Sequence, residues 1–243
     1  MRIRLHFAKT DAMRYTSHLD LHRAWERTIR RAGLPLAYTQ GFRPHPRINL
    51  ASALPLGFTS LDEVVDIWLE TELPLEQLNF QLAKSLPPGL QVKSIEEVEA
   101  HLPALQVELL ASEYQITLLE AVPDLDQQIE AVRSAETLPR VWRNKQYDLR
   151  PLIIEVQRIE DDPRGQQRLR LLISARESAT GRPEEVILAV GGQPALARVQ
   201  RTHLVFRQLD HPVLEGAPAK AEIIRNPATV LNSEETTHKQ ESP

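Results

Sequence analysis

The sequence predicts an α+β fold, because segments with the periodicity of strands and of helices alternate along the chain. Over residues 1–100 the predicted order is strand, helix, strand, strand, helix, strand, and a similar order begins again after a proline-containing junction at 101–107. This order is typical of the ferredoxin-like arrangement, in which helices cover one face of an antiparallel sheet. We therefore expect two tandem ferredoxin-like units, at 1–100 and 108–209, that share an interface but keep separate cores and separate sheets.

The first unit begins with the segment RIRLHFA, in which apolar residues alternate with Arg2, Arg4 and His6. This period of two residues is typical of a half-buried strand with a cationic outer face. Ser17 is a suitable N-cap for a helix over about 18–32, where apolar residues recur at helical spacing. The remaining elements of this unit are expected to be strands at 47–51, 63–70 and 90–98 and a helix at 75–86.

The second unit is predicted in the same way from periodicity and turn residues. A hairpin is expected around DDPRG, and proline is well placed in the first turn of a short helix at 183–190. The strands are expected at 113–120, 140–147, 152–159, 168–174 and 198–208, and the other helix at 124–135. Residues 210–243 are rich in Pro, Ala, Glu, Ser and Thr without any period, which predicts a disordered tail.

The composition bounds the class of protein. With 243 residues, 42% of them apolar, the chain is long enough to bury a core. No apolar run approaches the roughly 18 to 20 residues that cross a bilayer, and the N-terminus lacks the apolar stretch of a signal peptide, so we expect a cytoplasmic protein without membrane contact. The absence of cysteine excludes disulfides, thiolate metal sites and an iron–sulfur cluster held by this chain.

Positive charge is concentrated near the N-terminus. Residues 1–57 hold ten Lys or Arg and three Asp or Glu, although the whole chain has a formal net charge of −4. Arginine also outnumbers lysine by 23 to 6, and its planar guanidinium is suited to bidentate contacts with phosphate or carboxylate. The first quarter of the chain therefore predicts an anionic partner.

The stretch YTQGFRPHPRINL, at 38–50, predicts a stiff loop, because Pro44 and Pro46 fix the backbone. In an extended backbone Arg43, His45 and Arg47 would point to roughly one side. We expect this loop, the entrance of the first helix and the polar stripe of that helix to bind RNA through Arg14, Arg23, Arg27, Arg30, Arg31, Arg43, His45 and Arg47. The alternative is that the arginines pair with carboxylates or carbonyls of the protein's own fold.

The segment MRYTSHLDLHR places His18 and His22 four residues apart, on one face of the first helix and close to Tyr15. These residues are candidates for general acid–base cleavage of an RNA phosphodiester without a metal. They are also candidates for simple RNA contact, or for residues that only complete the edge of the core. A metal site is not expected, because an accompanying glutamate and a third ligand are missing from the motif.

A second candidate cluster lies in KQYDLRPLI and ahead of the last helix. Lys145, Asp148 and Arg150 are expected at the end of a strand, and Arg182 precedes the helix of GRPEEV. Such a cluster could bind a ligand. The alternative is an internal pair between Asp148 and an arginine that fixes the loop.

Three segments together resemble a known family: residues 1–57, YDLRPLI and GRPEEV are similar to the radical-SAM-linked proteins, a family of unknown function. Its members are found fused to, or encoded beside, a radical S-adenosylmethionine enzyme with a cobalamin-binding region. The first unit is more weakly similar to the ferredoxin-like RNA-processing proteins of the CRISPR Cas6 type, and this resemblance implies a catalytic role for a histidine near the first helix. The loop SLPPGL has a single glycine where those proteins have a glycine-rich loop.

The resemblance implies a companion of a radical SAM enzyme, with S-adenosylmethionine, the iron–sulfur cluster and cobalamin held by that partner and no cofactor held by this chain. Combined with the basic N-terminal quarter, it predicts a non-catalytic accessory protein that binds RNA, with tRNA or rRNA as the first candidates. The first alternative is a metal-independent RNA endonuclease that uses His18 or His22. The second is a protein-only adaptor of the radical SAM enzyme.

Overall fold

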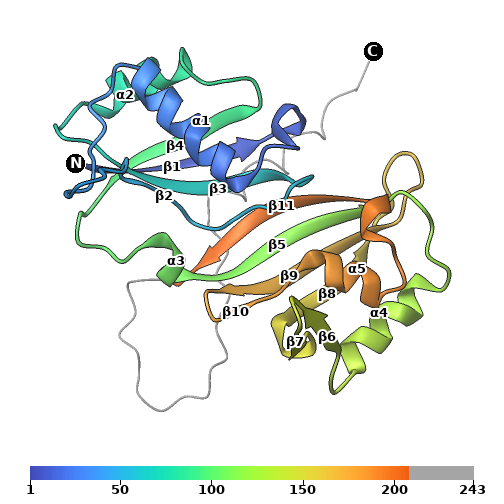
Figure 1. Cartoon of the computed structure of the whole chain (residues 1–243). Coiled ribbons are helices and arrows are strands. Elements are labelled where there is room, and N and C mark those ends of the chain that lie inside the picture. Colours follow the sequence, from blue (N-terminus) through green and yellow to red (C-terminus); the bar gives the residue numbers. More distant parts are fainter. Residues whose placement is uncertain (208–243) are drawn as a thin grey trace, which may run out of the picture. The chain divides into compact units, whose positions relative to one another are not determined.

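A nine-stranded sheet runs through residues 1–207, the part of the chain that the computed structural model describes (Figure 1). Its main path follows the order β10-β9-β5-β11-β3-β1-β4, while β2 pairs with β3 and β8 pairs with β9. The α+β class predicted from the sequence is therefore confirmed. The tail predicted at 210–243 lies outside the described residues.

The N-terminal half has the predicted order of elements. The elements are β1 (Arg2–Lys9), a short 3-10 helix (Asp11–Met13), α1 (His18–Arg31), β2 (Ile48–Leu50), β3 (Thr59–Trp68), α2 (Leu75–Ala83) and β4 (Leu90–Val98). β1 pairs antiparallel with both β3 and β4, and β2 pairs antiparallel with β3. The helix α1 begins where the sequence predicts it, because the Ser17 hydroxyl accepts the backbone N–H of Asp20 at 3.2 Å.

The C-terminal half repeats this order with one inserted hairpin. Its elements are α3 (Leu105–Glu108), β5 (Leu109–Leu118), α4 (Leu125–Ser134), β6 (Pro139–Trp142), β7 (Lys145–Asp148), a 3-10 turn (Arg150–Leu152), β8 (Ile153–Ile159), β9 (Arg168–Arg176), β10 (Ala179–Thr180), α5 (Pro183–Ala189), a further 3-10 turn (Pro194–Leu196) and β11 (Ala197–Phe206). The single strand predicted at 140–147 is wrong, because Arg143 and Asn144 have φ of 46° and 64°. Positive φ at both central residues makes a tight turn, so β6 and β7 form a separate two-stranded sheet.

The two halves meet where β11 pairs with β3, a junction that we call the seam. Gln200 and Arg201 pair in parallel with Thr59 and Ser60. This pairing is possible because β2 covers only Val65–Ile67 of the same edge of β3, which leaves the first residues of β3 open. The sheet is therefore continuous, and the expectation of two separate sheets is wrong.

The apolar cores of the two halves are nevertheless distinct. In the first, Leu5, Phe7 and Ile67 pack against Trp25 and Ile29 of α1. The rings of Phe7 and Trp25 meet edge to face, with centroids 4.9 Å apart. The second core gathers buried residues of β5, β8, β9, β11, α4 and α5, together with Leu54 and Phe58 from the chain before β3. A smaller cluster of Ala51, Val64, Leu105, Leu109 and Leu204 spans both halves, so the two cores are not completely separate.

Candidate functional site

The exposed face of α1 carries the predicted arginine stripe. Arg23 pairs with Asp20 at 3.2 Å and Arg30 pairs with Glu26 at 2.9 Å. Arg27 and Arg31 are exposed and, within residues 1–207, neither makes an ion pair or a side-chain hydrogen bond. Arg27 retains only a longer-range attraction to Asp20. Two of the four cations on this helix are therefore free to meet an external anion.

The loop after α1 is closed at its base and held beside the helix. An isolated bridge joins Tyr38 to Pro46. Inside it, Thr39 donates its backbone N–H to the carbonyl of His45 at 2.9 Å, and its hydroxyl accepts the backbone N–H of His45 at 2.9 Å. The Tyr38 hydroxyl accepts hydrogen bonds from the Arg30 guanidinium at 2.6 and 3.1 Å. The base of the loop is thus fixed to the C-terminal part of α1, in agreement with the stiffness predicted from its prolines.

The tip of this loop presents an aromatic side chain and a cation to solvent. Gly41 has φ of +127°, a conformation that L side chains rarely adopt. Phe42 follows it with a relative exposure of 109%, and Arg43 is also exposed without a partner among the described side chains. Phe42 was not among the predicted site residues. The sequence does contain a local indication of it, since an aromatic residue between a turn glycine and an arginine has no apolar neighbour with which to form a core.

The loop does not present its three predicted basic groups on one side. Ile48 packs into the core next to α1, and side chains alternate along an extended backbone, so Arg47 lies on the opposite face. There its guanidinium stacks on the ring of Trp68 at 4.8 Å, and the Arg2 guanidinium lies at the same distance from that ring. Arg43 and His45 remain with the exposed part of the loop.

One of the two helix histidines contacts the chain that follows the loop. His22 lies with Nε2 at 3.3 Å from the carbonyl oxygen of Ile48, while His18 is one turn nearer the start of α1. Partial burial, followed by the charges of His22 and Arg201, lowers the pKa of His18, so its neutral form is favoured. Tyr15 is 78% exposed. The structure thus brings His18 and His22 to one side of the helix as predicted.

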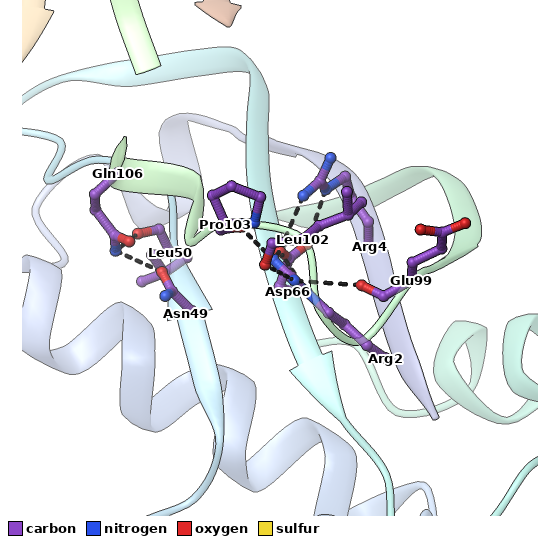
Figure 2. A network of polar contacts seen from close by, with 9 residues as sticks. All are labelled: Arg2, Arg4, Asn49, Leu50, Asp66, Glu99, Leu102, Pro103 and Gln106. Atoms are coloured by element: carbon purple, nitrogen blue, oxygen red, sulfur yellow. Dashed lines mark hydrogen bonds and ion pairs between the residues drawn. The ribbon is translucent and has the colours of Figure 1, made fainter. Parts of the chain in front are cut away.

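Figure 2 shows Arg2 and Arg4 converging on the buried carboxylate of Asp66. Arg2 Nη2 lies 2.5 Å from Asp66 Oδ2, and Arg4 Nε lies 2.9 Å from Asp66 Oδ1. Arg2 Nη1 also donates to the carbonyl of Leu102 at 2.6 Å, which ties the junction between the halves to β1. The cationic side chains on the predicted outer face of the first strand therefore make internal contacts.

At the seam, charged side chains are buried on the face that carries the helices. Arg201 Nε lies 3.2 Å from Glu63 Oε1, and Arg201 Nη2 donates to the carbonyl of Ala53 at 2.9 Å. Lys9 donates to the carbonyl of Phe58 at 3.1 Å. Burial raises the pKa of Glu63 and lowers that of Lys9. These groups hold three strands together, and no local spacing in the sequence predicts them.

The opposite face of the seam carries a carboxylate shared by two histidines. His6 Nδ1 lies 3.0 Å from Asp62 Oδ1, and His203 Nδ1 lies 3.2 Å from Asp62 Oδ2. Burial alone would raise the pKa of Asp62, but the hydrogen bonds from His203 and His6 outweigh it and lower that pKa well below its ordinary value. The cluster links β1, β3 and β11 across the two halves.

A polar cavity of about 250 Å³ opens at one end of the seam. Arg14 lines it and pairs with Asp11 at 2.5 Å, so its charge is balanced locally. Arg14 precedes α1, and none of the four arginines of that helix lines this cavity. The lining residues are Thr10, Asp11, Arg14, Thr59, Ser60, Leu61, Gln115, Thr117, Arg198, Val199 and Gln200.

The second predicted cluster is spread over several structural roles. Asp148 accepts the backbone N–H groups of Leu138 and Arg150 at 2.7 and 3.0 Å, rather than an arginine side chain. The Arg150 guanidinium donates to backbone carbonyls, including that of Ile153 at 3.1 Å. Arg182 lies 3.5 Å above the ring of Trp142, and Lys145 is exposed on β7. The structure therefore does not gather the four residues into one pocket.

Within residues 1–207, no set of three or more His, Asp or Glu side chains is arranged to hold a metal ion. The helices in this part of the chain are also too short or too polar to cross a bilayer.

Residues 2–183 match the sequence model of a family described as "Uncharacterized protein conserved in bacteria (DUF2344)". The chain belongs to this family. Comparison with curated proteins finds no match. Among solved structures, a chain of a Cbf5–Nop10–Gar1 complex is similar at 12% identity with a TM-score of 0.43, over 84% of this chain and 50% of that one. A chain of the archaeal box H/ACA sRNP Nop10–Cbf5 complex is similar at 15% identity with a TM-score of 0.35, over 75% and 42%. The chain thus spans about half the length of the matched chains or less.

Proposed function

We propose that this protein is a non-catalytic RNA-binding accessory protein, and that it binds RNA through the exposed side of α1 and the loop after it. We call this the α1–loop surface and define it by Arg27, Arg31, Arg43 and His45. The observation that carries the proposal is that its three arginines are exposed and unpaired within the described chain, whereas Arg201 of the seam is buried and paired. An unpaired arginine can contact a phosphate without first breaking an internal ion pair.

The test is a triple substitution of Arg27, Arg31 and Arg43 by alanine, followed by RNA binding at several salt concentrations. Each contact between a cation and a single-strand phosphate adds about −0.7 to the slope of log affinity against log salt. If each arginine meets one phosphate, the variant flattens that slope by about two units. The matched control replaces Arg164, Arg176 and Arg198, which are also exposed and without an ion pair within the described chain but lie in the C-terminal half.

Equal loss of RNA affinity in both triple variants would contradict binding at the α1–loop surface, because the loss would then depend only on the net charge of the protein. An unchanged salt slope in the first variant would contradict RNA binding by these arginines. If the wild type does not bind RNA and the variant no longer co-purifies with a radical SAM enzyme, the protein is instead a protein-only adaptor whose basic loop meets an acidic partner.

The partner that we propose is a radical SAM enzyme, on the basis of the resemblance of residues 1–57, YDLRPLI and GRPEEV to the radical-SAM-linked proteins. In this proposal the enzyme holds the S-adenosylmethionine, iron–sulfur cluster and cobalamin, and this chain presents tRNA or rRNA to it in the cytoplasm. We also propose that each half is a ferredoxin-like unit. The strand orders β4-β1-β3-β2 and β11-β5-β9-β8 support this, because each has the first strand between the third and fourth and the second strand outside the third.

A second candidate function is metal-independent RNA cleavage by His18. The observation in its favour is the lowered pKa of His18, because a neutral imidazole is the form that a general base requires. Incubation of the purified protein with total RNA in the presence of a chelator separates the candidates, since only an endonuclease produces discrete fragments. Under the accessory function, His18→Ala and His22→Ala alter binding modestly. A loss of cleavage by orders of magnitude in either folded variant would favour the endonuclease.

A further inference from the structure

We infer that Phe42 stacks on an unpaired base, so that the α1–loop surface selects single-stranded RNA over duplex RNA. This inference rests on the proposed function and names the class of RNA that the surface takes. A single exposed phenylalanine is common on protein surfaces and indicates nothing by itself. The argument depends on how the structure holds Phe42 and on what surrounds it.

The loop holds Phe42 away from the protein while its base stays fixed. The Tyr38–Pro46 bridge and the Thr39–His45 hydrogen bonds close the loop behind the tip. An exposure of 109% leaves the Phe42 ring without burial against the fold, so its apolar surface contributes nothing to the core. A fixed loop loses less conformational entropy on binding than a flexible one, which makes the ring available to a partner at low cost.

Arginines lie next to Phe42 in sequence and at the base of its loop, but within the described residues no cation covers the ring. Arg43 is the next residue, and the hydrogen bonds from Arg30 to the Tyr38 hydroxyl place the loop base beside the arginine stripe of α1. A stacking ring next to cations that can reach the phosphates is the usual combination in proteins that bind single-stranded nucleic acid. Bases in a duplex are already stacked on each other and do not offer a face to Phe42.

A second exposed phenylalanine offers a comparison within the same chain. Phe80 on α2 is 62% exposed, but Lys84 lies over its ring at 3.7 Å from the centroid. Within the described residues no cation or aromatic ring occupies the Phe42 ring in this way. Phe80 therefore already has an internal partner, and Phe80→Ala is a suitable control for the loss of an exposed aromatic ring.

The experiment measures the binding of a labelled single-stranded RNA oligonucleotide and of its duplex by fluorescence anisotropy. Phe42→Ala should weaken binding of the single strand by about 5- to 140-fold, the range that the loss of one base–aromatic stack represents. Its salt slope should stay as in the wild type, because no phosphate contact is lost. Duplex affinity should not change, Phe42→Tyr should bind like the wild type, and Phe80→Ala should have no effect.

Two outcomes overturn the inference and are distinct from failure of the proposed function. If Phe42→Ala binds the single strand like the wild type while the Arg27, Arg31 and Arg43 triple variant loses affinity, the result supports RNA binding by the α1–loop surface. The same result contradicts base stacking by Phe42. If Phe42→Ala weakens the single strand and the duplex equally, base stacking is not what Phe42 contributes. If neither variant changes RNA affinity, the proposed function itself falls with the inference.

Discussion

The α1–loop surface and the seam use the same residue types in opposite ways. At the seam, Arg201 is buried and its charge is compensated by Glu63. On the α1–loop surface, Arg31 and Arg43 are exposed and unpaired within the described chain. A buried, paired charge stabilises the pairing of strands and cannot contact a ligand in solution. An exposed, unpaired charge needs no internal partner and can contact a ligand directly. This contrast, more than the number of arginines, points to where a partner binds.

The largest expected effect tests the structural role of the seam. Glu63→Ala leaves Arg201 and Lys9 buried without a compensating carboxylate, and breaking a buried pair in this way costs about 3–5 kcal/mol. The free energy of unfolding from chemical denaturation should fall by that amount. The control is Glu26→Ala on α1, which removes the partner of the exposed Arg30 and should cost about 1 kcal/mol or less. Equal losses of unfolding free energy in the two variants would contradict the claim that the ion pair of the seam stabilises the fold more than the exposed pair on α1 does.

A smaller effect, with a dependence on pH, is expected from the Asp62 cluster. Asp62→Asn removes the charged acceptor of His6 and His203 and should lower the free energy of unfolding by about 1–3 kcal/mol at neutral pH. The folded protein lowers the pKa of Asp62. Its stabilising contribution is therefore complete above the unfolded pKa of about 4 and is lost as the pH falls through the lower folded value.

Unfolding measured from pH 6 down to about pH 2 checks the sign of this linkage. The wild type should lose stability on acidification more steeply than Asp62→Asn, because only the wild type must protonate this carboxylate. Parallel curves would show that Asp62 does not couple the two histidines in the way that its distances imply.

Most elements of both halves could be predicted from the sequence, apart from the β6–β7 hairpin and the short elements α3 and β10, but the seam could not. Alternation in RIRLHFA and helical spacing around Trp25 are local patterns that report which face of each element is buried. The pairing of β11 with β3 joins residues about 140 positions apart, such as Arg201 and Ser60. No local pattern specifies such a pairing, because it depends on which strand edge the rest of the fold leaves open.

The candidate site shows the same limit. Net charge and arginine spacing located the basic helix and loop, since both are short-range features. They did not reveal that Asp20 and Glu26 engage Arg23 and Arg30. They also did not reveal Phe42, because exposure is decided by what packs against a residue and not by the residue itself.

The smallest expected effect separates the two surfaces within a single loop. Arg47 stacks on Trp68 on the face opposite to α1, so Arg47→Ala should lower the free energy of unfolding by about 0.5–1 kcal/mol, the value of an exposed cation–π contact. Arg43 makes no such contact, and Arg43→Ala should leave stability unchanged while flattening the salt slope of RNA binding by about 0.7. Denaturation and salt titration of both single variants measure these differences. If Arg47→Ala flattened the salt slope as much as Arg43→Ala without a loss of stability, Arg47 would belong to the RNA-binding surface, and the loop would present its basic groups together as the sequence predicts.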